Sequence, residues 1–141
     1  FNIAKGMVGY YATLPATNDT LIAIALEASG LESDATLMDK DTFADVVSGA
    51  TNEQTSLTRK TLASVTSTVN DVDDRRDIDA ADITWTAPSG NPVGAIVVCY
   101  DSDTTGGTDA NLIPLTLHTV TWNPADGIDT TWTVADLLRI S

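Results

Sequence analysis

The chain has 141 residues, 43% of them apolar, and a formal net charge of −13. This length suits one domain with its own core, and the apolar content excludes a disordered chain. No apolar run approaches the roughly 18 residues that a membrane-spanning helix needs, and so acidic a surface repels phosphates. Neither a membrane nor a nucleic acid is therefore an expected partner.

Residues 1–50 are predicted to form the helix-containing part of the chain. Residues 2–14 predict an amphipathic helix that ends before Pro15, because four apolar side chains recur there at helical spacing: Ile3, Met7, Tyr10 and Leu14. Residues 21–26 alternate large aliphatic side chains with alanine, which favours a strand over a helix. A second helix is expected over residues 39–49, since its first turn is acidic and Gly49 ends it.

Residues 51–141 predict the β-rich part. Alternating threonine, serine and apolar residues over 57–69 and 78–87 indicate two strands, joined as an antiparallel hairpin by a charged turn at 70–77. Further strands are expected at 95–100, 112–122 and 130–134, followed by a short terminal element at 135–140. Pro114 indicates that the 112–122 strand lies at a sheet edge, at least locally.

These elements predict one domain over residues 1–141, of the α+β class and mostly β. We expect a compact antiparallel sheet or sandwich with an N-terminal helix and one further short helix. A parallel α/β fold is excluded because no ten-residue helical pattern separates the later strands.

The stretch after the apolar run 95–100 is rich in carboxylates, threonines and glycines. The spacing of Asp101, Asp103 and Thr105 matches the first motif of the haloacid-dehalogenase-type phosphohydrolases, in which one Asp attacks phosphorus and another transfers a proton. Those enzymes also need a later Lys, and no Lys follows Asp101. We therefore expect no enzymatic activity.

The same loop is a candidate calcium site. Its potential ligands are Asp101, Asp103 and Asp109, spaced as in the opening of an EF-hand loop, but Leu112 stands where a bidentate Glu belongs. A calcium site of another type stays open, with further oxygens from Asp73, Asp74 or Asp77. The favoured interpretation is a structural turn made possible by Gly106 and Gly107.

Four other features admit a functional and a structural interpretation. Cys99 is the only cysteine, and its apolar surroundings predict a buried, inert thiol. His118 is the only candidate catalytic base, and simple alternation puts it opposite Leu115 and Leu117 on the more exposed face. Arg75 and Arg76, flanked by aspartates, indicate a turn that neutralises itself.

The three tryptophans are the fourth such feature. Trp85, Trp122 and Trp132 are interpreted first as core or interface residues, and second as a surface on which sugar rings stack.

Segments along nearly the whole chain resemble a family of small virion structural proteins of tailed bacteriophages, especially those of actinobacteria. They are residues 1–6, 34–42, 51–54, 59–62, 77–79, 84–86 and 98–109. The resemblance implies a place in the virion, as a capsid decoration protein or a minor tail protein, and carries no catalytic residues with it.

We therefore expect a non-enzymatic virion protein that decorates or cements the capsid exterior through subunit contacts. Its expected partners are other virion proteins, such as the major capsid protein, and further copies of itself, for example in a trimer. The expected contact residues are the helical stripe Ile3, Met7, Tyr10 and Leu14, and no cofactor other than calcium is expected. The alternatives are a minor tail or tail-tip protein and a carbohydrate-binding module for the host surface.

Overall fold

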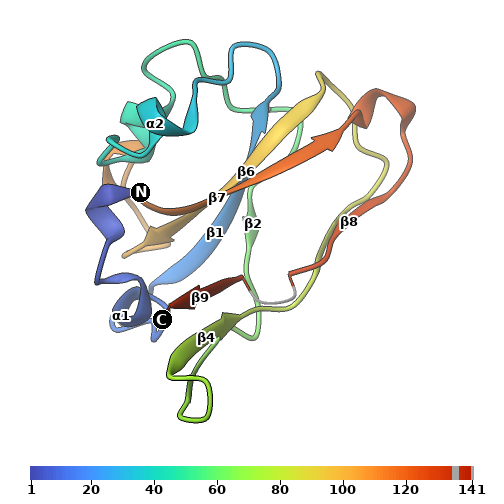
Figure 1. The fold of residues 1–141 in the computed structure, drawn as a ribbon. Coiled ribbons are helices and arrows are strands. Elements are labelled where there is room, and N and C mark those ends of the chain that lie inside the picture. The colour runs from blue at the N-terminus through green and yellow to red at the C-terminus, as the bar shows by residue number, and fades with distance from the viewer. Residues whose placement is uncertain (135–136, 141) are drawn as a thin grey trace.

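A four-stranded antiparallel sheet runs through the molecule (Figure 1). The computed structural model describes residues 1–134 and 137–140, with the side chain of Ile140 excepted. The strand order of the central sheet is β2-β1-β6-β7. Its strands are β1 (Thr20–Glu27), β2 (Lys60–Thr61), β6 (Val93–Asp101) and β7 (Ile113–Trp122).

Two small antiparallel sheets complete the β structure. The first has the order β3-β4-β9, with β3 (Thr66–Asn70), β4 (Arg75–Asp79) and β9 (Leu138–Ile140). The second pairs β5 (Ile83–Trp85) with β8 (Thr130–Trp132). The expected mostly-β fold with antiparallel sheets is confirmed.

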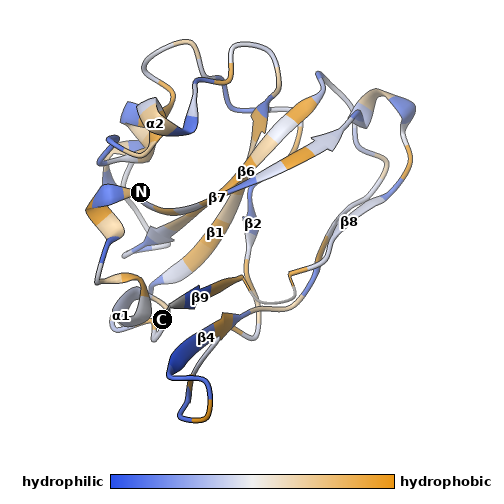
Figure 2. Cartoon of the chain, in the orientation of Figure 1, coloured by the Kyte–Doolittle hydropathy of each residue, from blue (hydrophilic) through white to orange (hydrophobic). Residues whose placement is uncertain are grey.

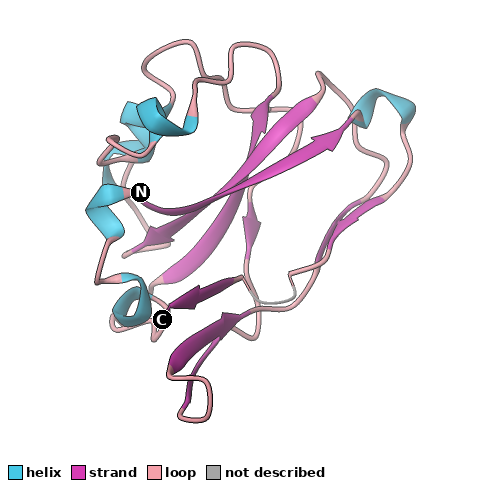
Figure 3. Ribbon diagram, viewed as in Figure 1, coloured by secondary structure: helices cyan, strands magenta, loops and turns pink. Residues whose placement is uncertain are grey.

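The helices are all short. The α-helices are α1 (Val8–Tyr11), α2 (Asp34–Leu37) and α3 (Phe43–Val46), and the 3₁₀ turns are η1 (Asn2–Ala4), η2 (Asp109–Asn111) and η3 (Pro124–Asp126). Most of them gather along one side of the central sheet (Figure 3). Within the described residues, no helix has the length and apolarity that a membrane crossing demands.

Hydrophobic residues are frequent along the central strands (Figure 2), and apolar side chains cover both faces of the central sheet. On one face, Ile24, Val97 and Cys99 pack with residues of the helical side, among them Phe43 of α3. On the other face, Ala23, Ile96 and Val98 of β1 and β6 belong to the cluster that contains residues of the two small sheets. Ile78 of β4 and Trp85 of β5 are examples of these residues. Because both faces are covered, β1 and β6 carry nearly continuous apolar runs, as buried strands do.

The N-terminal and C-terminal parts of the chain share this sheet. β1 comes from the first 50 residues and pairs with β6 along its whole length, from Thr20 opposite Asp101 to Glu27 opposite Val93. The expected strand at 21–26 is thereby confirmed and is longer by one residue at each end. The predicted strand at 95–100 is likewise confirmed within β6.

The prediction of one helix over residues 2–14 is wrong. The segment forms η1 and α1, separated by a turn in which Gly6 adopts a left-handed φ of 77°. Leu14 also has a positive φ, of 50°, and ends the helical region. Apolar spacing alone did not reveal the break, because glycine is tolerated in a helical pattern until its backbone is seen.

The predicted helix over residues 39–49 is much shorter in the structure. α3 begins after Thr42, whose side chain accepts a hydrogen bond from the Asp45 amide while Asp45 caps the Thr42 amide in return. Such a capping box fixes a helix start. The pattern of the sequence did not predict α2, in which the Ser33 side chain caps the helix by accepting a hydrogen bond from the Thr36 amide.

The predicted hairpin is confirmed, with shifted boundaries. β3 pairs with β4 from Asn70 opposite Arg75 to Thr66 opposite Asp79, so the charged residues 75–77 belong to the strand and not to the turn. The predicted strands 57–69 and 78–87 are each divided in two. Of the terminal element at 135–140, residues 135 and 136 lie outside the described residues, and the rest contains β9.

β7 is an edge strand of the central sheet, as predicted. The predicted orientation of His118 is wrong, because β7 contains a β-bulge before that residue. Thr116 lies opposite Val98, and Pro114 lies opposite Cys99, so Leu115 is an extra residue. An extra residue reverses the alternation beyond it. His118 therefore lies on the same face as Leu115 and is half-buried, not on the exposed face.

Candidate functional site

The carboxylate loop after β6 is held by its own side chains. Asp101 accepts a hydrogen bond from the Asp103 amide at 3.1 Å. Asp103 accepts one from the Thr105 amide at 3.0 Å and another from the Thr105 hydroxyl. These bonds from Thr105, the hydroxyl first, lower the pKa of the Asp103 carboxyl from its ordinary value. They are the bonds expected of a structural turn.

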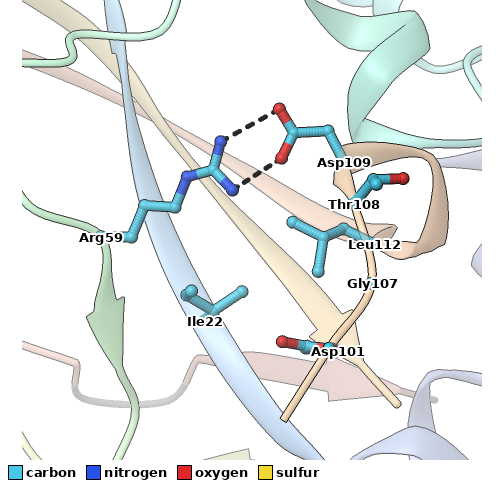
Figure 4. Close-up of a pocket in the computed structure, with 8 residues that line it drawn as sticks. Ile22, Arg59, Asp101, Gly107, Thr108, Asp109 and Leu112 are labelled. Carbon is cyan, nitrogen blue, oxygen red and sulfur yellow. Dashed lines mark hydrogen bonds and ion pairs between the residues drawn. The ribbon is translucent and has the colours of Figure 1, made fainter. Parts of the chain in front are cut away.

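Arg59 ties this loop to a distant part of the chain (Figure 4). Its guanidinium contacts Asp109 at 2.7 Å and 3.1 Å and Glu53 at 2.8 Å and 2.6 Å. It also lies over the Phe43 ring, 5.0 Å from the ring centre. The hydrogen bonds that Arg59 donates to Glu53 and then to Asp109 raise the pKa of Arg59 further above its already high value. Arg59 is therefore a cation held between two carboxylates and an aromatic face.

A hollow of about 150 Å³ lies beside this ion pair (Figure 4). Arg59 and Asp109 line one part of it, and Asp101 lines another. A neighbouring hollow of about 140 Å³ is lined by Asp101 and Asp103. The structure thus brings the three predicted calcium ligands to adjoining hollows.

An ion pair competes with the predicted calcium site for Asp109. Asp109 is already paired with Arg59, which a calcium ion would have to displace. Residues 1–134 and 137–140 contain no group of three acidic, histidine or cysteine side chains arranged to hold a metal ion. Calcium binding stays a prediction, and titration of the protein with calcium tests it.

Two aspartates of the β3–β4 hairpin, Asp73 and Asp77, pair with an arginine of the same hairpin. Arg75 pairs with Asp77 at 2.8 Å and with Asp73 at 3.3 Å. Arg76 donates to the Ser67 hydroxyl at 2.8 Å. The interpretation of a turn that neutralises itself holds for Arg75, whereas Arg76 serves the pairing of β3 with β4.

Cys99 and His118 are both packed inside the fold. The Cys99 thiol is fully buried in the core, and this burial raises its pKa, so the unreactive thiol form dominates. The His118 Nε2 atom lies 2.9 Å from the Thr116 hydroxyl, and its ring lies 5.1 Å from that of Trp132. Burial lowers the pKa of His118, which favours the neutral ring.

The predicted N-terminal contact residues do not behave as one stripe. Ile3, Met7 and Tyr10 are exposed by 42%, 41% and 54%, whereas Leu14 is half-buried against the core. η1 instead buries Ala4, and α1 packs Val8 and Tyr11 partly buried against the core. The predicted apolar stripe is therefore largely a surface feature.

A further exposed methionine extends this surface. The Asn2 amide donates to the Met38 carbonyl at 2.8 Å, which joins η1 to the end of α2. Met38 is exposed by 43%. Met38 also lines a hollow of about 200 Å³, together with Phe1, Asp34, Leu37 and Leu117. We call Ile3, Met7, Tyr10 and Met38 the N-terminal patch.

Neither Arg59 nor Met38 was predicted from the sequence as a site residue. The partners of Arg59 lie six and 50 residues away, and Met38 reaches the patch through the packing of α2 on η1. Neither arrangement leaves a signal in local spacing.

Comparison of the chain with protein-family models, with curated proteins and with solved structures found no match.

Proposed function

We propose that this chain is a non-enzymatic structural protein of a tailed-phage virion that decorates or cements the capsid exterior. The observation that carries the proposal is the exposure of the four large apolar side chains of the N-terminal patch, three within residues 3–10 and the fourth at the end of α2, which a hydrogen bond joins to η1. Exposed apolar groups of this size are typical of protein–protein contact surfaces when they cluster. The resemblance to small virion proteins supports the same conclusion.

The charge of the chain supports a partner that carries basic groups. The net charge is −13, and Arg59 and Arg75 are engaged by carboxylates of the chain itself. A negative surface attracts and orients a partner with positive potential around the contact. The proposed partner is the major capsid protein, with further copies of this chain, for example in a trimer, completing the assembly.

The patch is tested by adding purified chain to particles that lack it. We expect the double variant Met7→Glu, Met38→Glu to bind these particles at least about tenfold more weakly than the unaltered chain, because two buried contacts become charges. The matched control is Val72→Glu at the tip of the β3–β4 hairpin, where the apolar side chain is exposed by 93%. Equal loss of binding in both variants would contradict a specific role of the patch.

The alternative within virions is a minor tail or tail-tip protein. Such a protein occupies few sites, so the position of the bound chain on the particle separates the two proposals. Label on the tail alone would contradict decoration of the capsid.

A further inference from the structure

The chain has two methionines, and both are exposed residues of the N-terminal patch. Met7 stands at the start of α1 and is exposed by 41%, and Met38 stands at the end of α2 and is exposed by 43%. Methionine carries its thioether sulfur near the end of a long, unbranched side chain. Both thioether side chains are therefore open to small molecules in the solvent.

Neither methionine side chain is part of the core. Among the residues that the structure describes, the two clusters of buried and partly buried apolar side chains include neither Met7 nor Met38. These residues support the fold through their backbone. The Met7 carbonyl accepts a hydrogen bond from the Tyr11 amide at 3.0 Å, and the Met38 carbonyl accepts one from the Asn2 amide at 2.8 Å. A chemical change confined to the two side chains leaves these bonds and the core in place.

The remaining sulfur atom of the chain is shielded. Cys99 lies fully buried in β6, and this burial raises the pKa of its thiol. Peroxides react with thiolates and with accessible thioethers, and a buried thiol is neither. A hydroperoxide therefore reaches sulfur only in the N-terminal patch.

We propose that Met7 and Met38 are oxidation sites at which a hydroperoxide makes the N-terminal patch polar without unfolding the chain. At each site the sulfur lone pair attacks one peroxide oxygen and the O–O bond breaks. The thioether is oxidised to a sulfoxide, and the departing oxygen takes up the proton of the transferred one, so that hydrogen peroxide is reduced to water. Methionine sulfoxide reductases reverse the change.

Oxidation of this kind acts on the surface that the proposed function uses for docking. A sulfoxide oxygen accepts hydrogen bonds from water, so covering it with an apolar partner surface costs free energy. Weaker docking of the oxidised chain therefore rests on the proposed function. The oxidation of both sites in the folded chain, and the loss of apolar surface, do not rest on it.

The first test treats the folded full chain and the denatured chain with excess hydrogen peroxide and follows the mass of each peptide. We expect the folded chain to gain one oxygen atom at Met7 and one at Met38, each at a rate within about tenfold of that in the denatured chain, while Cys99 stays reduced. A slower reaction at either methionine would overturn the proposal, because that side chain would then be shielded.

The second test asks whether oxidation removes apolar surface and preserves the fold. After removal of the peroxide, the oxidised chain should elute earlier from a hydrophobic interaction column, and its ¹H–¹⁵N NMR spectrum should change only near the two methionines. Unchanged elution, or spectral changes that extend through β1 and β6, would overturn the proposal.

The matched control is the double variant Met7→Leu, Met38→Leu. Leucine is apolar and close to methionine in size, but it has no thioether. Peroxide treatment should leave the elution of this variant unchanged. An equally earlier elution of the treated variant would show that the effect arises elsewhere in the chain and would overturn the proposal.

The third test measures binding to particles that lack the chain. The oxidised chain should bind at least about fivefold more weakly than the untreated chain, whereas the leucine variant should bind equally well before and after treatment. Equal binding of the oxidised and untreated chains would overturn the effect on docking. If the untreated chain does not bind at all, the proposed function fails, and the first two tests decide the oxidation of the patch.

Discussion

Arg59 connects three segments that are far apart in the sequence. It joins the loop before β2 to η2 through Glu53 and Asp109, and it covers the Phe43 ring of α3. The Arg59 side chain is only partly exposed, by 30%. Paired carboxylates that lose a shared cation keep their desolvation cost and repel each other.

We expect Arg59→Met to lower the free energy of unfolding by about 1–3 kcal/mol, because Glu53 and Asp109 lose their common partner. Denaturant unfolding measures this change. The control is Lys5→Met, which removes the same charge from an exposed position and should stay within about 0.5 kcal/mol of the unaltered chain. Similar losses in both variants would show that net charge, not the ion pair, is responsible.

His118 should make the stability depend on pH. Burial lowers its pKa below the ordinary value of 6.5, so the unfolded chain binds a proton more readily than the folded one. Its contribution is therefore fully present above about pH 6.5 and is lost as the pH falls toward the lower folded pKa.

The measurement is the free energy of unfolding between about pH 8 and pH 5 for the unaltered chain and for His118→Gln. We expect the unaltered chain to lose stability relative to the variant as the pH falls. A parallel course of the two curves would contradict burial as the dominant influence on His118.

At the scale of elements, the loop after β6 depends on one glycine conformation. Gly107 has a φ of 93°, and a Cβ there would lie 3.3 Å from the Asn111 side-chain oxygen, which caps η2. Its neighbour Gly106 does not have a positive φ, and a Cβ there would come no closer than 3.9 Å to Asp103.

These neighbours form a matched pair of variants. We expect Gly107→Ala to cost about 1–2 kcal/mol of unfolding free energy, because alanine is strained at this φ. Gly106→Ala should change it by less than about 0.5 kcal/mol. Thermal and denaturant unfolding measure both. The turn interpretation fails if the two substitutions have the same effect.

The strands were more predictable than the helices. The alternation of large aliphatic residues with alanine indicated β1, a continuous apolar run indicated β6, and Pro114 indicated the edge position of β7, because these signals are local. The helical stripe failed because apolar spacing does not say which face is buried, and Ala4 is buried while Ile3 is exposed.

The sites were less predictable than the fold. The carboxylate loop and the tryptophans were recognised from composition, but the pairing of Asp109 with Arg59 joins residues 50 positions apart. The face of His118 depends on the extra residue Leu115 in β7, which alternation cannot reveal. Both features are set by register and packing across the sheet.

At the scale of the molecule, a strongly acidic chain exposes several large apolar side chains. Negative charge dominates the chain, the central sheet is covered on both faces, and the N-terminal patch leaves four large apolar side chains exposed. A surface of this kind suits contact with a larger assembly, where the patch is covered and the negative charge meets basic groups.

The most direct test of this account is to count and locate the chain in purified virions. Quantitative mass spectrometry against the major capsid protein gives the copy number, and electron cryo-microscopy gives the position. We expect copies in proportion to the shell subunits, on the capsid exterior, with Met7 and Met38 against a neighbouring subunit. A handful of copies confined to the tail, or absence of the chain from the particle, would contradict it.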